Sequence, residues 1–340
     1  MRKCSLNIIN EVFAEIAKSE MLFLPVDNKD GRAEYTKWTD GCQLSNQLNT
    51  VRSPKDFFFP QTENLMEFKV SGKNIEIVDT RTAKEDFVVF GVRACDAKAF
   101  EILDRVFLTE PKDSYYASAR EHGTIVTVAC DKPAETCFCS TFDIDASNPG
   151  GDVSAWKADG EMFFKANTEK GEKLLERLAH LTEDADEDAV NGAKEKISAI
   201  MKKLPLANIS KDKLGGGKTM ELFDAPEWAE LSSACLGCGT CTFVCPTCQC
   251  YDIKDFNTGH GVVRFRCWDS CMYSEFTKMA HGNNRNTQKE RFRQRFMHKL
   301  VYFPENNDGI FGCVGCGRCI SKCPINMNIV KVMKKLGGNA

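Results

Sequence analysis

Apolar residues recur with a helical period in some segments of the chain and form short continuous runs in others. Residues 8–19 repeat apolar side chains at helical spacing, and short strand-like runs separated by turns follow to about residue 165. Between two of these runs, Ala97–Phe107 carries an apolar stripe with the period of a helix. This strand–helix–strand unit predicts a parallel strand pair with a right-handed crossover. The clearest strands are predicted at Met66–Val70, Ile75–Val78, Phe87–Val92 and Thr124–Ala129.

The second half of the chain has a more helical pattern. Residues 170–204 predict two charged amphipathic helices joined by the acidic run 183–188, which we interpret as a solvated face or a helix N-terminus. The glycine-rich segment 211–221 predicts a linker. Two further basic helices are predicted at 288–299 and 329–336. The pattern therefore divides the chain into an α/β domain with a partly parallel sheet over 1–210, the linker, and a mainly α-helical domain over 222–340.

One cysteine phrase occurs twice in the second domain. It has the spacing C-x2-C-x2-C-x3-C-P, which is typical of [4Fe–4S] ligation, and in paired clusters the fourth cysteine ligates the other cluster. A zinc ribbon also uses C-x2-C pairs but has no use for the third cysteine or the Cys-Pro ending. We therefore predict a ferredoxin-like domain that binds two [4Fe–4S] clusters. The first cluster is expected on Cys235, Cys238, Cys241 and Cys323, and the second on Cys313, Cys316, Cys319 and Cys245.

Composition limits the possible functions. The net charge of −3 and a pI of about 6.1 give no field that favours nucleic acid or an anionic membrane. From the lack of a continuous apolar stretch in the first residues we expect no signal peptide, and the apolar runs are too short to span a bilayer. Eighteen cysteines in such a chain indicate reduced thiols and metal rather than a disulfide scaffold. We expect a cytoplasmic protein of an anaerobic cell, because exposed cubanes are sensitive to oxygen.

Four cysteines outside the repeated phrase follow the predicted parallel strands. Cys95 and Cys130 each sit in an Ala-Cys-Asp tripeptide at a strand end, and Cys137 and Cys139 follow in the next loop. Because the ends of parallel strands meet at one sheet edge, these thiols predict a third metal site, most simply another cubane. The alternative is that they are buried small hydrophobic residues. Asp96 is a possible cap of the following helix.

A further set of four cysteines lies after the first phrase. Cys248, Cys250, Cys267 and Cys271 either form a fourth cluster or pack as thiols beside the first two clusters. Cys4 and Cys42 have no partner by spacing and are expected to be free. The basic residues of the 288–299 helix either balance the negative charge of thiolate-bound cubanes or form a solvated face. They are Arg291, Arg293, Arg295 and Lys299.

With these residues in place, the chain resembles a known family over almost its whole length. The family comprises the iron–sulfur subunits of anaerobic sulfite reductases, the beta subunits of cytosolic sulfhydrogenases and related subunits of heterodisulfide reductase complexes. The resemblance rests on the two ferredoxin phrases together with Gly91-Val-Arg-Ala-Cys95-Asp, Ala129-Cys130-Asp, Cys137-Phe-Cys139, Cys245-Pro-Thr-Cys248-Gln-Cys250-Tyr and Ser270-Cys271-Met.

The resemblance implies a [4Fe–4S] subunit that passes electrons. Its implied neighbours are a flavin-containing subunit that oxidises NAD(P)H and a catalytic subunit of the sulfite reductase, hydrogenase or heterodisulfide reductase type. We accordingly expect an electron-transfer subunit of a soluble oxidoreductase complex, with no catalytic acid, base or nucleophile of its own. Two alternatives remain open: a catalytic reductase with an unusual open cluster, and a redox sensor that carries clusters.

Overall fold

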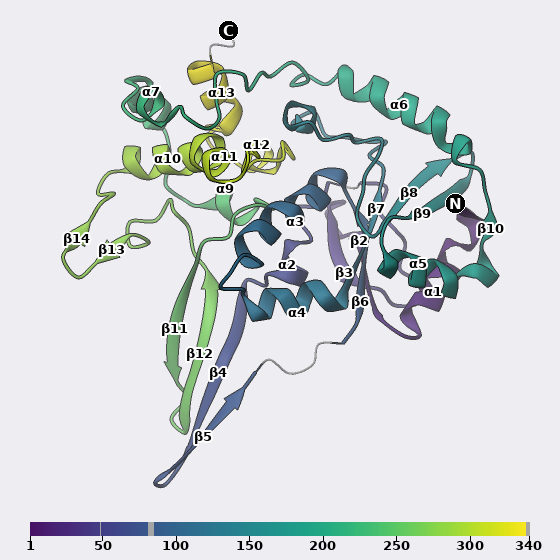
Figure 1. The fold of residues 1–340 in the computed structure, drawn as a ribbon, viewed down its shortest axis with the longest axis horizontal. Coiled ribbons are helices and arrows are strands. Elements are labelled where there is room, and N and C mark those ends of the chain that lie inside the picture. Colours follow the sequence, from purple (N-terminus) through teal and green to yellow (C-terminus); the bar gives the residue numbers. More distant parts are fainter. Residues whose placement is uncertain (48, 81–84, 338–340) are drawn as a thin grey trace.

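A mixed sheet forms the centre of the N-terminal half (Figure 1). The computed structural model describes residues 1–47, 49–80 and 85–337, and within them this sheet has eight strands in the order β10-β1-β9-β8-β7-β6-β2-β3. The strands are β1 (Arg2–Ser5), β2 (Met21–Asp27), β3 (Ala33–Lys37), β6 (Phe87–Val92), β7 (Gly123–Val128), β8 (Val153–Ala158), β9 (Glu161–Ala166) and β10 (Glu183–Asp184).

The middle of the sheet is parallel, which confirms the predicted partly parallel α/β architecture. Strands β2, β6, β7 and β8 pair in parallel, and the strands outside them pair antiparallel. Every residue of β6 and β7 is buried, which explains their continuous apolar runs without alternation. The connection between them holds two helices, α3 (Ala94–Phe107) and α4 (Ser114–His122), where the sequence pattern predicted one. Asp113 caps α4 by accepting a bond from the Tyr116 amide at 2.9 Å.

Helices cover both faces of this sheet. Helices α1 (Ile9–Ala17) and α5 (Glu169–Arg177) pack on the face that carries Val88 and Phe90. Helices α2 (Lys55–Phe58), α3 and α4 pack on the face that carries Phe87 and Val89. Helix α6 (Asn191–Lys202) is the second helix predicted in 170–204, and the acidic run before it forms the exposed strand β10. The remaining short helices of this half are 3-10 turns at Leu6–Ile8, Cys139–Phe142, Ala179–Leu181 and Glu187–Val190.

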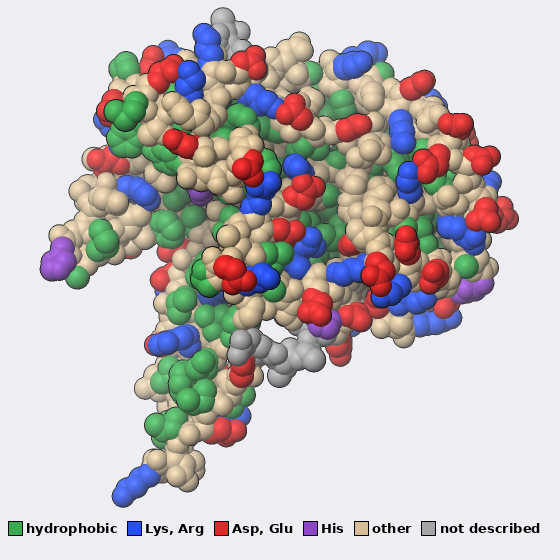
Figure 2. All heavy atoms as spheres, viewed as in Figure 1, with side chains coloured by type: hydrophobic (Ala, Val, Ile, Leu, Met, Phe, Trp, Pro, Cys, Tyr) green, Lys and Arg blue, Asp and Glu red, His purple; other side chains and the backbone are tan. Residues whose placement is uncertain are grey.

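A second sheet projects from the body as an arm, which we define as β4 (Thr62–Ser71), β5 (Asn74–Asp79), β11 (Tyr251–Asn257) and β12 (Gly261–Trp268) (Figure 1). The strands are antiparallel in the order β11-β12-β4-β5, so two hairpins that are distant in sequence pair along β12 and β4. Figure 2 shows hydrophobic side chains along the arm. Ile75, Ile77 and Phe256 are each more than 60% exposed.

The C-terminal residues form short helices around the cysteine phrases. The prediction of a mainly helical segment omitted β11 and β12 and the small hairpin of β13 (Lys278–Met279) and β14 (Gly282–Asn283). Helix α10 begins at a capping box between Thr287 and Glu290 and continues into a π-helical turn over His298–Tyr302. The helices are α7 (Thr219–Leu222), α8 (Glu227–Ser232), α9 (Thr240–Phe243), α10 (Gln288–Met297), α11 (Phe303–Asn306), α12 (Arg318–Ser321) and α13 (Ile329–Gly337).

One hydrophobic core joins both halves of the chain. Phe138 and Trp156 from the first half pack in the same cluster as Phe292, Phe296 and Met333 from the second. The predicted domains 1–210 and 222–340 therefore share this core as well as the arm. Within the described residues, no helix is both long enough and apolar enough to cross a bilayer.

Candidate metal centres

The first predicted cysteine set lines a small, partly open cavity. Cys235, Cys238, Cys241 and Cys323 all face this cavity, so the fourth thiol comes from the second phrase. The rest of the lining is largely apolar and includes Met272, Phe292, Phe296 and Met327. Cys238 is the exposed member of the set. A chamber with four thiols and an apolar wall suits a cubane, whose potential depends on its exposure and on hydrogen bonds to its sulfurs.

The two phrases fold into the same loop. Gly239 and Gly317 occupy equivalent positions with φ of 72° and 74°, and a short helix (α9 or α12) begins directly after each. A left-handed backbone there turns the loop back, so that three cysteines can face one side, and glycine adopts it without a Cβ clash. The sequence repeat is therefore a structural repeat.

The second predicted set gathers around Cys245. Burial raises the pKa of Cys313 to about 12, and the neighbouring Cys245 adds to that increase. Burial also raises the pKa of Cys316 and of Cys319, and Cys245 contributes in both cases. Cys245 is thus electrostatically close to all three thiols of the 313–319 loop. Cys245 also adds to the raised pKa of Cys241 in the first set, so it lies near both loops and the crossed ligand pairing stays a prediction.

Two buried cations lie beside these sets. The Lys299 Nζ, in the π-helical turn, donates to Thr247 Oγ1 at 2.7 Å and to Gly312 O at 2.9 Å. One Nη of Arg295 donates to Cys241 O at 2.9 Å. Burial opposes the charge on both side chains, but nearby thiolates, including Cys245, outweigh it and raise the pKa of each. These two residues are therefore placed to balance negative charge at the metal centres.

The other two basic residues of the helix serve different contacts. Arg291 donates to the backbone oxygens of Arg285 and Asn286. The Arg293 guanidinium lies 3.6 Å from the centre of the Phe223 ring. Neither contact involves a cysteine, so only Arg295 and Lys299 of this helix are placed to balance the negative charge of the thiolates.

The third predicted set is assembled at the edge of the parallel sheet. Its four thiols, Cys95, Cys130, Cys137 and Cys139, are each 5–7% exposed. Burial raises the pKa of Cys139 to about 12, and the charges of Cys137 and Cys130 add to it. Burial likewise raises the pKa of Cys95, with contributions from Asp96, Cys316 and Cys139. Cys139 is therefore electrostatically close to each of the other three thiols, and the third metal site itself stays a prediction.

This third set is packed against the loop of the second. The Phe138 amide donates to Gly315 O at 2.8 Å. A Cβ on Gly315 would lie 2.5 Å from Phe138 O, and one on Gly317 would lie 2.4 Å from Thr136 O. Backbone thus touches backbone between segments 136–139 and 315–317, and only glycine permits this approach. The second set therefore adjoins the third. It also adjoins the first, because burial raises the pKa of Cys241 to about 11 and the charges of Cys319 and Cys245 add to it.

A buried ion pair joins the same two segments. Arg318 binds Asp96 through two bonds of 2.6 and 2.7 Å, and the side chains are both 2% exposed. Arg318 also donates to Thr50 O at 2.9 Å. Asp96 therefore does not cap helix α3, which begins without a side-chain cap. The alternative interpretation of Asp96 as a helix cap is corrected by this contact.

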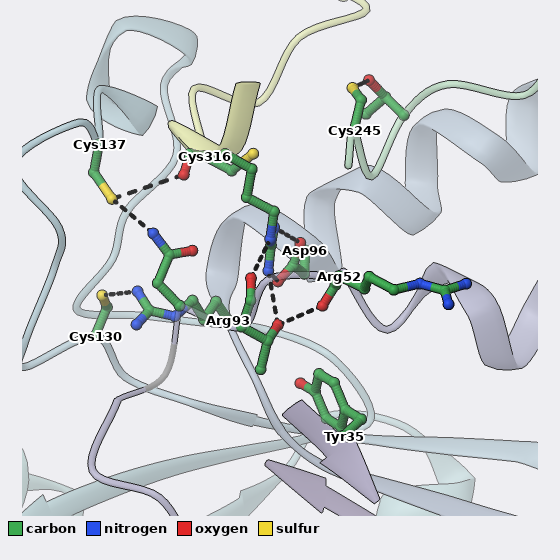
Figure 3. A network of polar contacts seen from close by, with 12 residues as sticks. Tyr35, Arg52, Arg93, Asp96, Cys130, Cys137, Cys245 and Cys316 are labelled. Atoms are coloured by element: carbon green, nitrogen blue, oxygen red, sulfur yellow. Dashed lines mark hydrogen bonds and ion pairs between the residues drawn. The ribbon is translucent and has the colours of Figure 1, made fainter. Parts of the chain in front are cut away.

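Two donors that the sequence patterns did not reveal, one on the buried Arg93 and one on the half-buried Asn49, lie near the third set, and Figure 3 shows Arg93 beside Cys130. One Nη of Arg93 lies 2.7 Å from Cys130 Sγ, and the Asn49 amide nitrogen lies 3.9 Å from Cys137 Sγ. Within the described residues, the Nε and the second Nη of Arg93 have no hydrogen-bond partner. Buried donors without acceptors are rare, so the residues present fit a group that carries sulfur acceptors. The position of Arg93 in Gly91-Val-Arg-Ala-Cys95-Asp was the available signal.

The remaining cysteines are only partly brought together. Bonding to the neighbouring Cys248 lowers the pKa of Cys245, and bonding to Cys271 lowers the pKa of Cys250 to about 7. Cys267 lies on strand β12, where alternation turns it away from the face that carries Trp268. Lys55, which donates to Cys248 O at 2.8 Å, lies on that Trp268 face at 3.6 Å from the ring centre. The predicted fourth set thus splits into thiols beside the first two sets and a separate Cys267.

Each of these cysteines can still ligate a metal, because none is held in a disulfide bond. All eighteen are free thiols; Cys4 is buried in the sheet, and Cys42 contacts Thr39 Oγ1 at 3.3 Å. Among the residues that the structure describes, no three His, Cys, Asp or Glu side chains converge closely enough to hold a single metal ion. The thiols of the first set instead surround a chamber.

Comparison with known proteins agrees with these features. Residues 234–327 match the family model described as a 4Fe-4S dicluster domain. Sulfhydrogenase 2 subunit beta of Pyrococcus furiosus is 32% identical over 333 residues, which cover 96% of this chain and 95% of that protein. No solved structure matches the chain. The resemblance seen in the sequence motifs is thereby confirmed, and the chain belongs to the family of iron–sulfur sulfhydrogenase beta subunits.

Proposed function

We propose that this chain is the electron-transfer subunit of an oxidoreductase complex. It relays electrons between a subunit that binds flavin and oxidises NAD(P)H and a catalytic reductase or hydrogenase subunit. The observation that supports this proposal best is the serial packing of three thiol sets, which runs from the exposed Cys238 to the buried edge of the parallel sheet. A relay needs such a series, whereas a single catalytic centre does not.

The ligand sets are proposed as follows. The first cubane is held by Cys235, Cys238, Cys241 and Cys323, and the second by Cys313, Cys316, Cys319 and Cys245. The third is held by Cys95, Cys130, Cys137 and Cys139. When bound, these clusters supply one-electron redox chemistry. Arg295 and Lys299 then stabilise the negative charge of the thiolates, and the contact between 136–139 and 315–317 keeps the second and third sets adjacent.

Anaerobic reconstitution of the full chain tests the ligand sets. We expect about twelve irons per chain, four for each cubane. The full chain is needed because Phe138 packs on the second phrase, which a fragment of the N-terminal half lacks. Cys323→Ala should lose about four irons and reproduce the electron paramagnetic resonance spectrum of Cys235→Ala. Cys42→Ala is the matched control, and it should keep the full iron content.

One result would contradict the crossed pairing of ligands. If the spectrum of Cys323→Ala instead matches that of Cys316→Ala, Cys323 serves the cluster of its own phrase and the proposed ligand sets are wrong.

The relay itself is tested with the partner proteins. The isolated chain should not oxidise NADH or NADPH, and its visible absorbance should bleach rapidly once the flavoprotein of its complex is added with the nicotinamide. Stoichiometric flavin in the purified chain, together with unaided nicotinamide oxidation, would show an enzyme rather than a relay.

A further inference from the structure

Arg93 is a buried cation whose charge has no acidic partner in the described part of the chain. It lies between strand β6 and helix α3 and is 2% exposed. One Nη contacts Cys130 Sγ at 2.7 Å, while its Nε and other Nη are unpaired within the described residues. The neighbouring carboxylate of Asp96 already binds Arg318 through both oxygens. The guanidinium therefore faces the third thiol set with donors to spare (Figure 3).

An unpaired guanidinium in this position is costly. A buried donor left without an acceptor destabilises the fold, and does so more strongly when it is charged. A thiolate-bound cubane would supply both the negative charge and several sulfur acceptors. The arginine thus matches the third site with a cluster bound, and not without one.

We propose that Arg93 is a positioning residue that donates hydrogen bonds to the sulfur atoms of the third site and raises its reduction potential. The inference rests on the proposed third cluster. Reduction adds one negative charge to a cluster, and a fixed positive charge stabilises the reduced form more than the oxidised form. Asn49, whose amide nitrogen lies near Cys137, adds a neutral donor on the other side. The third site would then accept electrons more readily than the same four cysteines would allow alone.

Redox titration of the reconstituted full chain, followed by electron paramagnetic resonance, tests this role. Arg93→Gln should keep about twelve irons and shift the potential of the third cluster to a lower value, with the other two unchanged. Arg93→Lys retains the charge and should restore much of the shift. Arg105→Gln is the control, because Arg105 is a surface residue paired with Asp308 at 2.9 Å. That variant should leave all three potentials unchanged.

A second measurement covers the case in which Arg93→Gln fails to hold the third cluster. Wild-type protein labelled with ¹⁵N-arginine should show a ¹⁵N coupling in the pulsed spectrum of the reduced third cluster, and Arg93→Lys should lack it.

The outcomes distinguish failure of the third cluster from failure of the role of Arg93. Only about eight irons in the wild type would refute both the third cluster and the role of Arg93. About twelve irons with an unchanged potential in Arg93→Gln, or with no ¹⁵N coupling in the wild type, would refute the role of Arg93 alone.

Discussion

Replacing Asp96 with asparagine should destabilise the contact between the second and third thiol sets. Asp96 neighbours Cys95, and its partner Arg318 lies between Cys316 and Cys319. Asp96→Asn keeps the size of the side chain but removes its charge. Arg318 then remains buried with an uncompensated charge, and one of its two bonds to Asp96 faces an amide nitrogen instead of an oxygen.

The expected effect is large because both side chains are 2% exposed. Removing one partner of a buried ion pair costs about 3–5 kcal/mol, far more than the loss of a surface pair. Using about 2 °C per kcal/mol, the lower coefficient for large domains, this corresponds to a fall in Tm of about 6–10 °C. The double replacement Asp96→Leu with Arg318→Met should lose much less, since no charge is left unpaired.

Anaerobic thermal unfolding of the reconstituted chain, followed by cluster absorbance and circular dichroism, measures this loss. Lys98→Gln is a suitable control, because its partner Glu101 is 63% exposed and the pair lies on the same helix. It should change the Tm by no more than about 1–2 °C, as for other surface pairs. An Asp96→Asn protein as stable as this control would show that the Arg318–Asp96 pair does not hold the two sites together.

Two further substitutions test other features of the fold. Gly315→Ala places a Cβ 2.5 Å from Phe138 O, so this variant should lose iron from the second and third sites. Gly309→Ala is the control: nothing lies within 4 Å of its Cβ, so it adds only backbone strain of about 1–3 kcal/mol from the positive φ. Equal iron contents in the two variants would contradict the close approach of the two segments. Burial lowers the pKa of His298 from 6.5 to about 4, so the stability it contributes is present above pH 6.5 and is lost as the pH falls toward 4. Wild-type protein should therefore lose about 2 kcal/mol between pH 7.5 and 5.0 that His298→Gln does not lose, and equal losses in the two proteins would refute this assignment.

The sequence predicted features that are encoded locally. The apolar runs of β6 and β7 and the stripe of α3 were recognisable because complete burial and helical period leave direct patterns. The two cysteine phrases predicted the two ligand loops because ligation of a cubane requires a fixed spacing of cysteines. One topological rule, that the ends of parallel strands meet at one edge, placed Cys95 and Cys130 at the same edge of the sheet, and both are electrostatically close to Cys139.

Features that depend on distant pairings were not predictable from local patterns. Strands β11 and β12 were missed because all of β11 is exposed and because β12 pairs with β4, where Val262 lies opposite Phe68. The partner of Asp96 lies 222 positions away in Arg318, so the sequence showed only a residue suited to a helix cap. Arg93 was overlooked because its place two residues before Cys95 was the only signal in the sequence, and its burial and its contact with Cys130 became visible only in the fold.

The pairing of β4 with β12 also determines when the second sheet can be completed during synthesis. During synthesis β4 and β5 leave the ribosome early, but their partner β12 follows only about 190 residues later. At 5–20 residues per second, the β4 edge therefore waits about 10–40 s with its backbone groups unpaired. The thiols of Cys95 and Cys130 wait for a similar time for the Gly315 loop that packs on their site. Iron delivery to this chain is thus a late event, and a chaperone that covers strand edges and thiols in the meantime would raise the yield of loaded protein.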